Sequence, residues 1–126
     1  MAAGILIITH NGIGPALLGT AKLMLNGCPL PAKLLNASTD SDPDQLLIDA
    51  TELVVELDAG DGVLILTDLA GSTPSNIASK INNNNVRIVS GVNLSMLIRV
   101  FNYPDSSLDE LAANALSGGR DGIIQV

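Results

Sequence analysis

Residues 4–15 read GILIITHNGIGP, an apolar run that ends in a polar, glycine-rich turn. The run at residues 4–9 is short and rich in β-branched side chains, which is typical of a central parallel strand buried on both faces. Pro15 suits the first position of a helix, because the backbone N–H that proline lacks has no helical partner there. The stretch therefore predicts a strand, a tight turn and a helix, the opening unit of an α/β fold.

The same alternation of apolar runs and helical spacing continues to the end of the chain. The predicted strands span residues 4–9, 32–36, 63–67, 86–90 and 123–126. The predicted helices span residues 16–25, 41–57 with Asp42 as cap, 75–81, 93–101 and 107–117, with a turn at 118–122. This order predicts one domain over residues 1–126, an open, doubly wound parallel sheet with right-handed crossovers and helices on both faces. The last strand is too short to stand alone and must join the edge of a sheet, either its own or a partner's.

Composition excludes several classes of function. The chain is 47% apolar but has one Phe, one Tyr and no Trp, so we expect an aliphatic core and no aromatic platform for nucleic-acid bases. The formal charge of −7 disfavours nucleic acid and anionic membranes as partners. One Cys and one His cannot make a cysteine or histidine metal site, and no cofactor motif is present. The first apolar run is too short for a signal peptide or a membrane span, which predicts a cytoplasmic protein.

The single histidine, His10, lies where the first strand ends. Asp68 follows the strand at residues 63–67 in the same way, so the two side chains meet if these strands are neighbours. A carboxylate that accepts one imidazole N–H fixes the tautomer and leaves the other nitrogen with a free lone pair. Asp68 could therefore hold one ring nitrogen of His10 and leave the other to attack an electrophile, an arrangement that fits a histidine carrying a phosphoryl group.

Both loops after these strands carry groups that suit an anion. Glycines let the backbone approach closely, hydroxyls donate, and backbone N–H groups at helix starts hold negative charge. The predicted pocket residues are Thr9, Asn11, Gly12, Gly71, Ser72 and Thr73. Structural interpretations stay open beside this one: a histidine that merely ends a strand, an aspartate that caps its loop, and an N-cap at residues 72–74.

Three motifs resemble the mannose-family enzyme IIA domain of the bacterial phosphoenolpyruvate-dependent sugar phosphotransferase system (PTS). They are the strand ending in Thr9-His10, then DLAGSTPSN at residues 68–76, then SGVNLSML at residues 90–97. The GRDG segment at residues 119–122 is also similar to the family's end. The sequence departs from the family's usual residues at Ala70, Ser72 and Ser95, which touch the rim of the loops.

The resemblance implies four parallel strands in the order 2-1-3-4 and a short antiparallel C-terminal strand exchanged within a homodimer. It also implies that the phosphocarrier HPr phosphorylates His10, that Asp68 orients the ring, and that Ser72 lines the pocket. We predict on this basis that Asp68 bonds Nδ1 of His10 and leaves Nε2 to carry the phosphoryl group. The acceptor would be an enzyme IIB component, with membrane components IIC and IID tying the complex to the membrane. A related phosphocarrier domain of the dihydroxyacetone kinase system is also similar, so the downstream acceptor stays open.

Three hypotheses for function follow. The first is a phosphoryl carrier in sugar phosphotransfer, a phosphotransferase component with a phosphohistidine intermediate. The second is a regulatory PTS module whose phosphorylation controls a partner protein. The third is a small-ligand binding domain with an inert histidine, which a deep, closed pocket would favour.

Overall fold

The computed structural model describes residues 2–126, which form a layered α/β domain. Its strands are β1 (Gly4–His10), β2 (Ala32–Ala37), β3 (Val63–Thr67) and β4 (Val86–Ser90). The four strands of the described residues are parallel and lie in the order β2-β1-β3-β4. The predicted fold class and strand order are thus confirmed.

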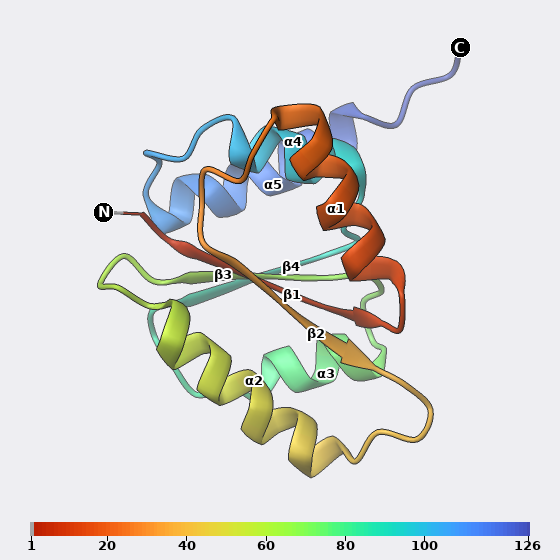
Figure 1. The fold of residues 1–126 in the computed structure, drawn as a ribbon, viewed down its shortest axis with the longest axis vertical. Coiled ribbons are helices and arrows are strands. Elements are labelled where there is room, and N and C mark those ends of the chain that lie inside the picture. The colour runs from red at the N-terminus through yellow and green to blue at the C-terminus, as the bar shows by residue number, and fades with distance from the viewer. Residues whose placement is uncertain (1) are drawn as a thin grey trace.

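Helices cover both faces of this sheet, as Figure 1 shows. On one face lie α1 (Ile13–Leu25), α4 (Leu94–Phe101) and α5 (Leu108–Asp121). On the other lie α2 (Pro43–Leu57) and α3 (Thr73–Ser79). None of the helices within residues 2–126 is long and apolar enough to cross a membrane.

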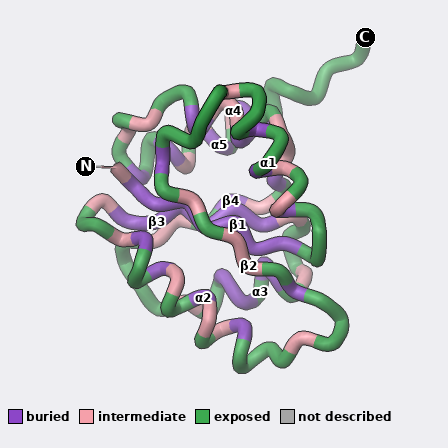
Figure 2. Tube along the Cα trace, in the orientation of Figure 1, coloured by how far each residue is buried: buried purple, intermediate pink, exposed green. Residues whose placement is uncertain are grey.

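Strand β1 forms the centre of the core. Residues 5–8 are completely buried, and Figure 2 shows the burial concentrated along the central strands. Ile5 and Ile7 pack beneath α1 and α4, whereas Leu6 and Ile8 pack against α2 and α3. This alternation sends successive side chains to opposite faces, so Thr9 continues the α1 face. A strand packed on both sides is a rigid support for the residue at its end.

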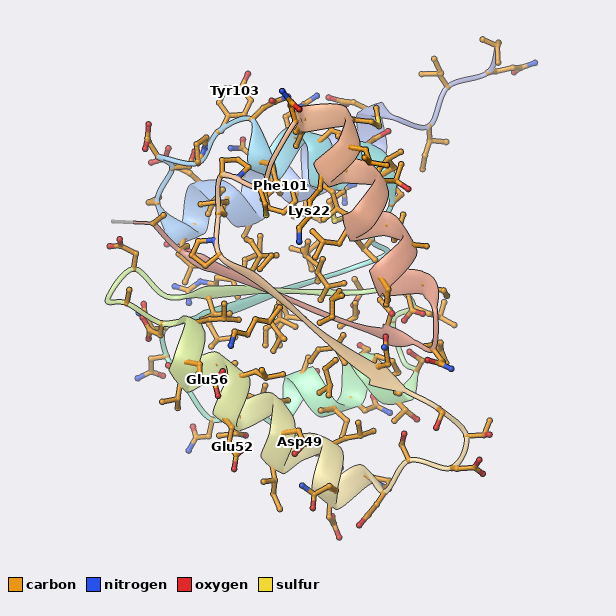
Figure 3. All side chains as sticks on the ribbon, viewed as in Figure 1. Lys22, Asp49, Glu52, Glu56, Phe101 and Tyr103 are labelled. Atoms are coloured by element: carbon orange, nitrogen blue, oxygen red, sulfur yellow. The ribbon has the colours of Figure 1, made fainter. Side chains whose placement is uncertain are left out.

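The core is aliphatic, as the composition predicts. Phe101 is buried between α4 and the sheet, while Tyr103 is 55% exposed on the loop after α4 (Figure 3). The opposite layer presents acid to solvent: Asp49, Glu52 and Glu56 project from α2 in the same view. These three carboxylates therefore lie at the surface, as expected for charged side chains.

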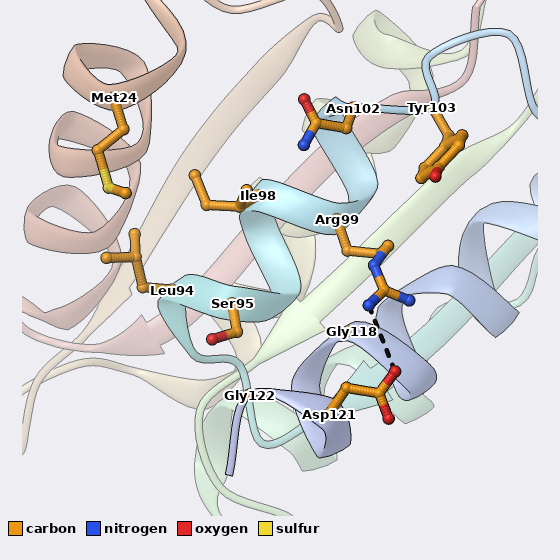
Figure 4. Close-up of a pocket in the computed structure, with 10 residues that line it drawn as sticks. All are labelled: Met24, Leu94, Ser95, Ile98, Arg99, Asn102, Tyr103, Gly118, Asp121 and Gly122. Carbon is orange, nitrogen blue, oxygen red and sulfur yellow. Dashed lines mark hydrogen bonds and ion pairs between the residues drawn. The ribbon is translucent and has the colours of Figure 1, made fainter. Parts of the chain in front are cut away.

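The predicted turn at residues 118–122 is wrong, because α5 continues to Asp121. Its glycines serve close packing rather than a break in the helix. A Cβ added to Gly118 would lie 2.4 Å from Cβ of Arg99, and one added to Gly122 would lie 2.1 Å from Oγ of Ser95. Figure 4 shows this side of α5 facing α4. Only glycine allows the two helices to approach so closely.

We expect Gly118→Ala to destabilise the fold by about 1–3 kcal/mol, because the new methyl group must displace the Arg99 stem from the α4–α5 contact. Urea unfolding measures the change. Gly19→Ala is the matched control, since Gly19 lies within α1 and an added Cβ there meets nothing within 4 Å. That variant should gain roughly 0.5–1 kcal/mol from helix propensity. Equal effects of the two substitutions would contradict the packing explanation.

The predicted strand at residues 123–126 does not form within the described chain. The segment extends away from the domain in Figure 1, and Ile123 and Ile124 are 78% and 72% exposed. Strand exchange with a second subunit stays a prediction.

Candidate functional site

The carboxyl ends of β1 and β3 lie side by side at one edge of the sheet. Ile8 pairs with Thr67 across the two strands, so His10 and Asp68 follow just beyond this pair. Figure 1 shows the starts of α1 and α3 at the same edge. The two loops that the sequence singled out are therefore neighbours, as their positions after adjacent parallel strands require.

His10 and Asp68 are in direct contact. Oδ2 of Asp68 lies 2.7 Å from the ring Nδ1 of His10 and accepts the backbone N–H of the same residue at 3.0 Å. The His10 side chain is 48% exposed, whereas that of Asp68 is 9% exposed. The predicted contact through Nδ1 is present, and one oxygen of a largely buried side chain holds both the main chain and the ring of an accessible histidine.

The protonation state of Asp68 decides the tautomer of this ring, because only an unprotonated oxygen must accept a hydrogen bond from it. Burial raises the pKa of the Asp68 carboxyl, but hydrogen bonds from the His10 ring and backbone outweigh it, so the pKa lies below its ordinary value. The group is thus a carboxylate at neutral pH and can only accept hydrogen bonds. Nδ1 must carry the proton, and Nε2 keeps its lone pair. No hydrogen bond from residues 2–126 involves Nε2.

Thr9 does not line an open pocket, in contrast to the sequence-based expectation. Its side chain is completely buried, and its Oγ1 donates to the His10 carbonyl at 2.9 Å and accepts the Gly14 N–H at 2.8 Å. Asn11 is exposed, and its backbone N–H donates to the Ala37 carbonyl at 3.0 Å. Gly12 adopts a left-handed conformation with φ of 88°, which allows the chain to turn from β1 into α1.

The second loop presents its backbone near the start of α3. Gly71 has φ of 81°, which favours glycine at this position. The Ser72 hydroxyl donates to the Leu69 carbonyl, so its proton is used within the loop. Ser72 is also the N-cap residue of α3, although its side chain makes no capping hydrogen bond. Thr73, the first residue of that helix, is exposed.

Sequence reasoning missed two features of this edge. Thr67, the residue before Asp68, is completely buried and its Oγ1 lies 2.7 Å from Oγ of Ser90, which ties β3 to β4. Ile13 and Leu69 expose 42% and 60% of their surface within a few residues of His10 and Asp68. A hydrogen bond between two side-chain hydroxyls cannot be recognised in a single sequence. Leu69, an apolar residue directly after the predicted site aspartate, was by contrast a signal that the edge of the site is accessible.

A cavity of about 460 Å³ lies away from these residues, between α1, α4 and α5 (Figure 4). None of its lining residues is a predicted site residue; they are Met24, Leu94, Ser95, Ile98, Arg99, Asn102, Tyr103, Gly118, Asp121 and Gly122. Arg99 pairs there with Asp121 at 3.3 Å and donates to the Ser117 hydroxyl at 3.2 Å. Its charge is therefore balanced within the protein. Within residues 2–126, no group of three or more His, Cys, Asp or Glu side chains could hold a metal ion.

Comparison with known proteins gives a consistent match. A family model described as the PTS system fructose IIA component matches residues 4–116. The mannose-specific EIIAB component of the PTS from Escherichia coli strain K12 is 32% identical over 127 residues, covering 98% of this chain. The chain spans 39% of the length of that curated relative.

Solved structures give the same result. The mannose/sorbose-specific IIA subunit of the phosphotransferase system from Enterococcus faecalis superposes with a TM-score of 0.88 at 25% identity, covering 100% of this chain and 96% of the other. The PTS IIA protein associated with the fucose utilization operon of Streptococcus pneumoniae has a TM-score of 0.80 at 27% identity, with coverages of 99% and 96%. Fold and sequence similarity thus extend over nearly the whole of this chain and of the two solved chains.

Proposed function

Because this chain belongs to the mannose-type enzyme IIA family of the phosphotransferase system, we propose that His10 accepts a phosphoryl group from phospho-HPr and passes it to an enzyme IIB component. The observation that carries the proposal is the Nδ1–Oδ2 contact of 2.7 Å, which leaves Nε2 as a free nucleophile on a half-exposed ring. An accessible ring suits a relay, since two different proteins must reach the same nitrogen.

The transfer needs little from the protein beyond a nucleophile and fixed charge. The Nε2 lone pair of His10 attacks the phosphorus of the donor phosphohistidine and forms a new N–P bond. The N–P bond of the donor breaks, and its electron pair returns to the donor imidazole. Positive charge develops on the His10 ring during attack, and the Asp68 carboxylate stabilises it through the Nδ1 proton.

The reverse of this step delivers the phosphoryl group onward. Both donor and acceptor are imidazole nitrogens, so the bond that forms resembles the bond that breaks, and each transfer is close to thermoneutral. We propose that backbone N–H groups after Gly12 and Gly71, at the starts of α1 and α3, donate hydrogen bonds to the phosphoryl oxygens. The proposed relay takes place in the cytoplasm, with membrane contact only through the transporter components.

Incubation with phosphoenolpyruvate, enzyme I and HPr tests the proposal. Labelled phosphate should enter the chain as a phosphohistidine, and it should leave on addition of an enzyme IIB component. Transfer from HPr without delivery to any enzyme IIB component would instead favour the regulatory module. Failure of the chain to accept phosphate from HPr would leave the histidine as an inert residue of a binding domain.

We also propose that the chain works as a homodimer in which residues 123–126 add to a second copy. β4 is an edge strand of the described sheet, and Ile88 on it is 38% exposed. Ile123, Ile124 and Val126 are exposed apolar side chains on a segment that pairs with no strand among residues 2–126. Pairing of this segment with the free edge of β4 in a second copy would supply hydrogen-bond partners to that edge and cover the apolar side chains of residues 123–126.

The double substitution Ile123→Asp with Ile124→Asp should convert the dimer into a monomer, because charge would be buried at the joined edge. Sedimentation equilibrium measures the change. Val55→Asp is the matched control, since Val55 is 70% exposed on α2 and lies on the other face of the sheet. A mass that is unchanged in the double variant would exclude strand exchange.

A further inference from the structure

Thr9 makes a buried bridge between the residue that carries the reactive ring and the first turn of α1. Its hydroxyl donates its only proton to the His10 carbonyl and accepts the Gly14 N–H, at 2.9 Å and 2.8 Å. The side chain has no exposed surface. Its proton is used within the protein and it has no access to solvent, so this hydroxyl cannot donate a hydrogen bond to a phosphoryl group. Any influence it has on the reaction must act through the backbone.

Gly14 is required for this bridge for a steric reason. A Cβ added to Gly14 would lie 2.9 Å from Oγ1 of Thr9 and 3.3 Å from side-chain carbons of Ile7 and Leu34. The absence of a side chain lets the start of α1 rest directly on the hydroxyl. Thr9 and Gly14 thus form one unit that sets the distance between β1 and α1.

The hydrogen bonds around His10 leave its main chain little freedom. On the β3 side, Asp68 holds both the backbone N–H and the ring Nδ1 of His10. On the α1 side, the Thr9 hydroxyl holds the His10 carbonyl. The two polar groups of the residue's backbone and one ring nitrogen are therefore fixed by two different elements. Loss of the carbonyl anchor would leave the peptide that follows the histidine held only by the Asn11 N–H, which donates to the Ala37 carbonyl at 3.0 Å.

We propose that Thr9 is a positioning residue: through the bridge from Gly14 N–H to His10 C=O it aims Nε2 along the line of phosphoryl transfer. This inference rests on the proposed function of His10 as the phosphoryl acceptor. It assigns to Thr9 a role in the rate of transfer, and none in the binding of phosphate or of a partner. Preorganisation of this kind matters because small misplacements of a nucleophile reduce rates strongly.

Thr9→Val tests the inference, because valine keeps the β-branched shape and removes only the hydroxyl. We expect kcat for transfer from phospho-HPr to fall by roughly tenfold to a hundredfold with KM unchanged. Thr9→Ser retains the hydroxyl and should restore kcat. Thr67→Val is the matched control, since Thr67 is equally buried at the end of β3 but its hydroxyl bonds Ser90 and makes no hydrogen bond with His10.

A second readout does not depend on phosphoryl transfer. The ¹⁵N shifts of the His10 ring report how fully the Nδ1–H tautomer is populated, and Thr9→Val should lower that population while Thr9→Ser retains it. Absence of phosphorylation in the wild-type chain would refute the proposed function and leave this readout to decide the role of Thr9. Unchanged kcat and ring shifts in Thr9→Val, or equal losses in Thr67→Val, would overturn the positioning role.

Discussion

His10→Ala should abolish phosphorylation by phospho-HPr completely, the largest effect that we expect of any substitution in this chain. The sequence holds no second histidine, so no other imidazole can replace the missing nucleophile. The bound phosphate of the wild-type chain should show the acid lability of an N–P bond. Gel-shift or radiolabel assays with enzyme I, HPr and phosphoenolpyruvate measure the loss.

The fold should survive this substitution, which makes the assay interpretable. The His10 side chain is half exposed, and in the variant Asp68 would keep the hydrogen bond from the backbone N–H of residue 10, which is 3.0 Å long in the wild-type chain. His10→Gln is the matched control, because its amide fills similar space and has no nucleophilic lone pair. Label that persists in either folded variant would show that another residue accepts phosphate.

Apolar patterning predicted the central part of this structure well. The runs that form β1 and β3 are buried on both faces, a pattern that solvent-exposed segments do not share. Adjacent parallel strands bring their carboxyl ends together, so the meeting of His10 and Asp68 followed from strand order alone. Strand and helix signals placed both residues at the carboxyl ends of strands, and the resemblance to the mannose-family domain supplied the strand order that makes these two strands neighbours.

Features that depend on tertiary packing could not be predicted in this way. Gly118 resembles a helix breaker in sequence, but α5 needs it for contact with the stem of Arg99. Thr9 resembles the polar end of a strand, but its hydroxyl is enclosed by the start of α1. In both cases the residue that makes the contact belongs to a different helix or strand. A pattern of neighbouring residues in the sequence therefore does not reveal it.

Asp68→Asn should slow phosphoryl transfer by about a hundredfold while keeping the fold, the second large effect that we expect. Two N–H donors of His10 point at one oxygen of Asp68, so the asparagine must place its oxygen there. Its NH₂ group then takes the position of Oδ1, which is buried and has no hydrogen-bond partner within residues 2–126. The ring should therefore keep its Nδ1–H tautomer and lose only the negative charge that supports it in the transition state.

The dependence of stability on pH gives the same substitution an independent check. The folded-state pKa of Asp68 lies below its ordinary value, which is about 4 in an unfolded chain. Its stabilising contribution is thus complete above that value and is lost as the pH falls through the lowered pKa. The difference in unfolding free energy between wild type and Asp68→Asn should shrink below about pH 4. A difference in unfolding free energy that stayed constant on acidification would mean that the carboxylate does not pair with His10 in solution. A transfer rate unchanged at neutral pH would mean that it does not support the reaction.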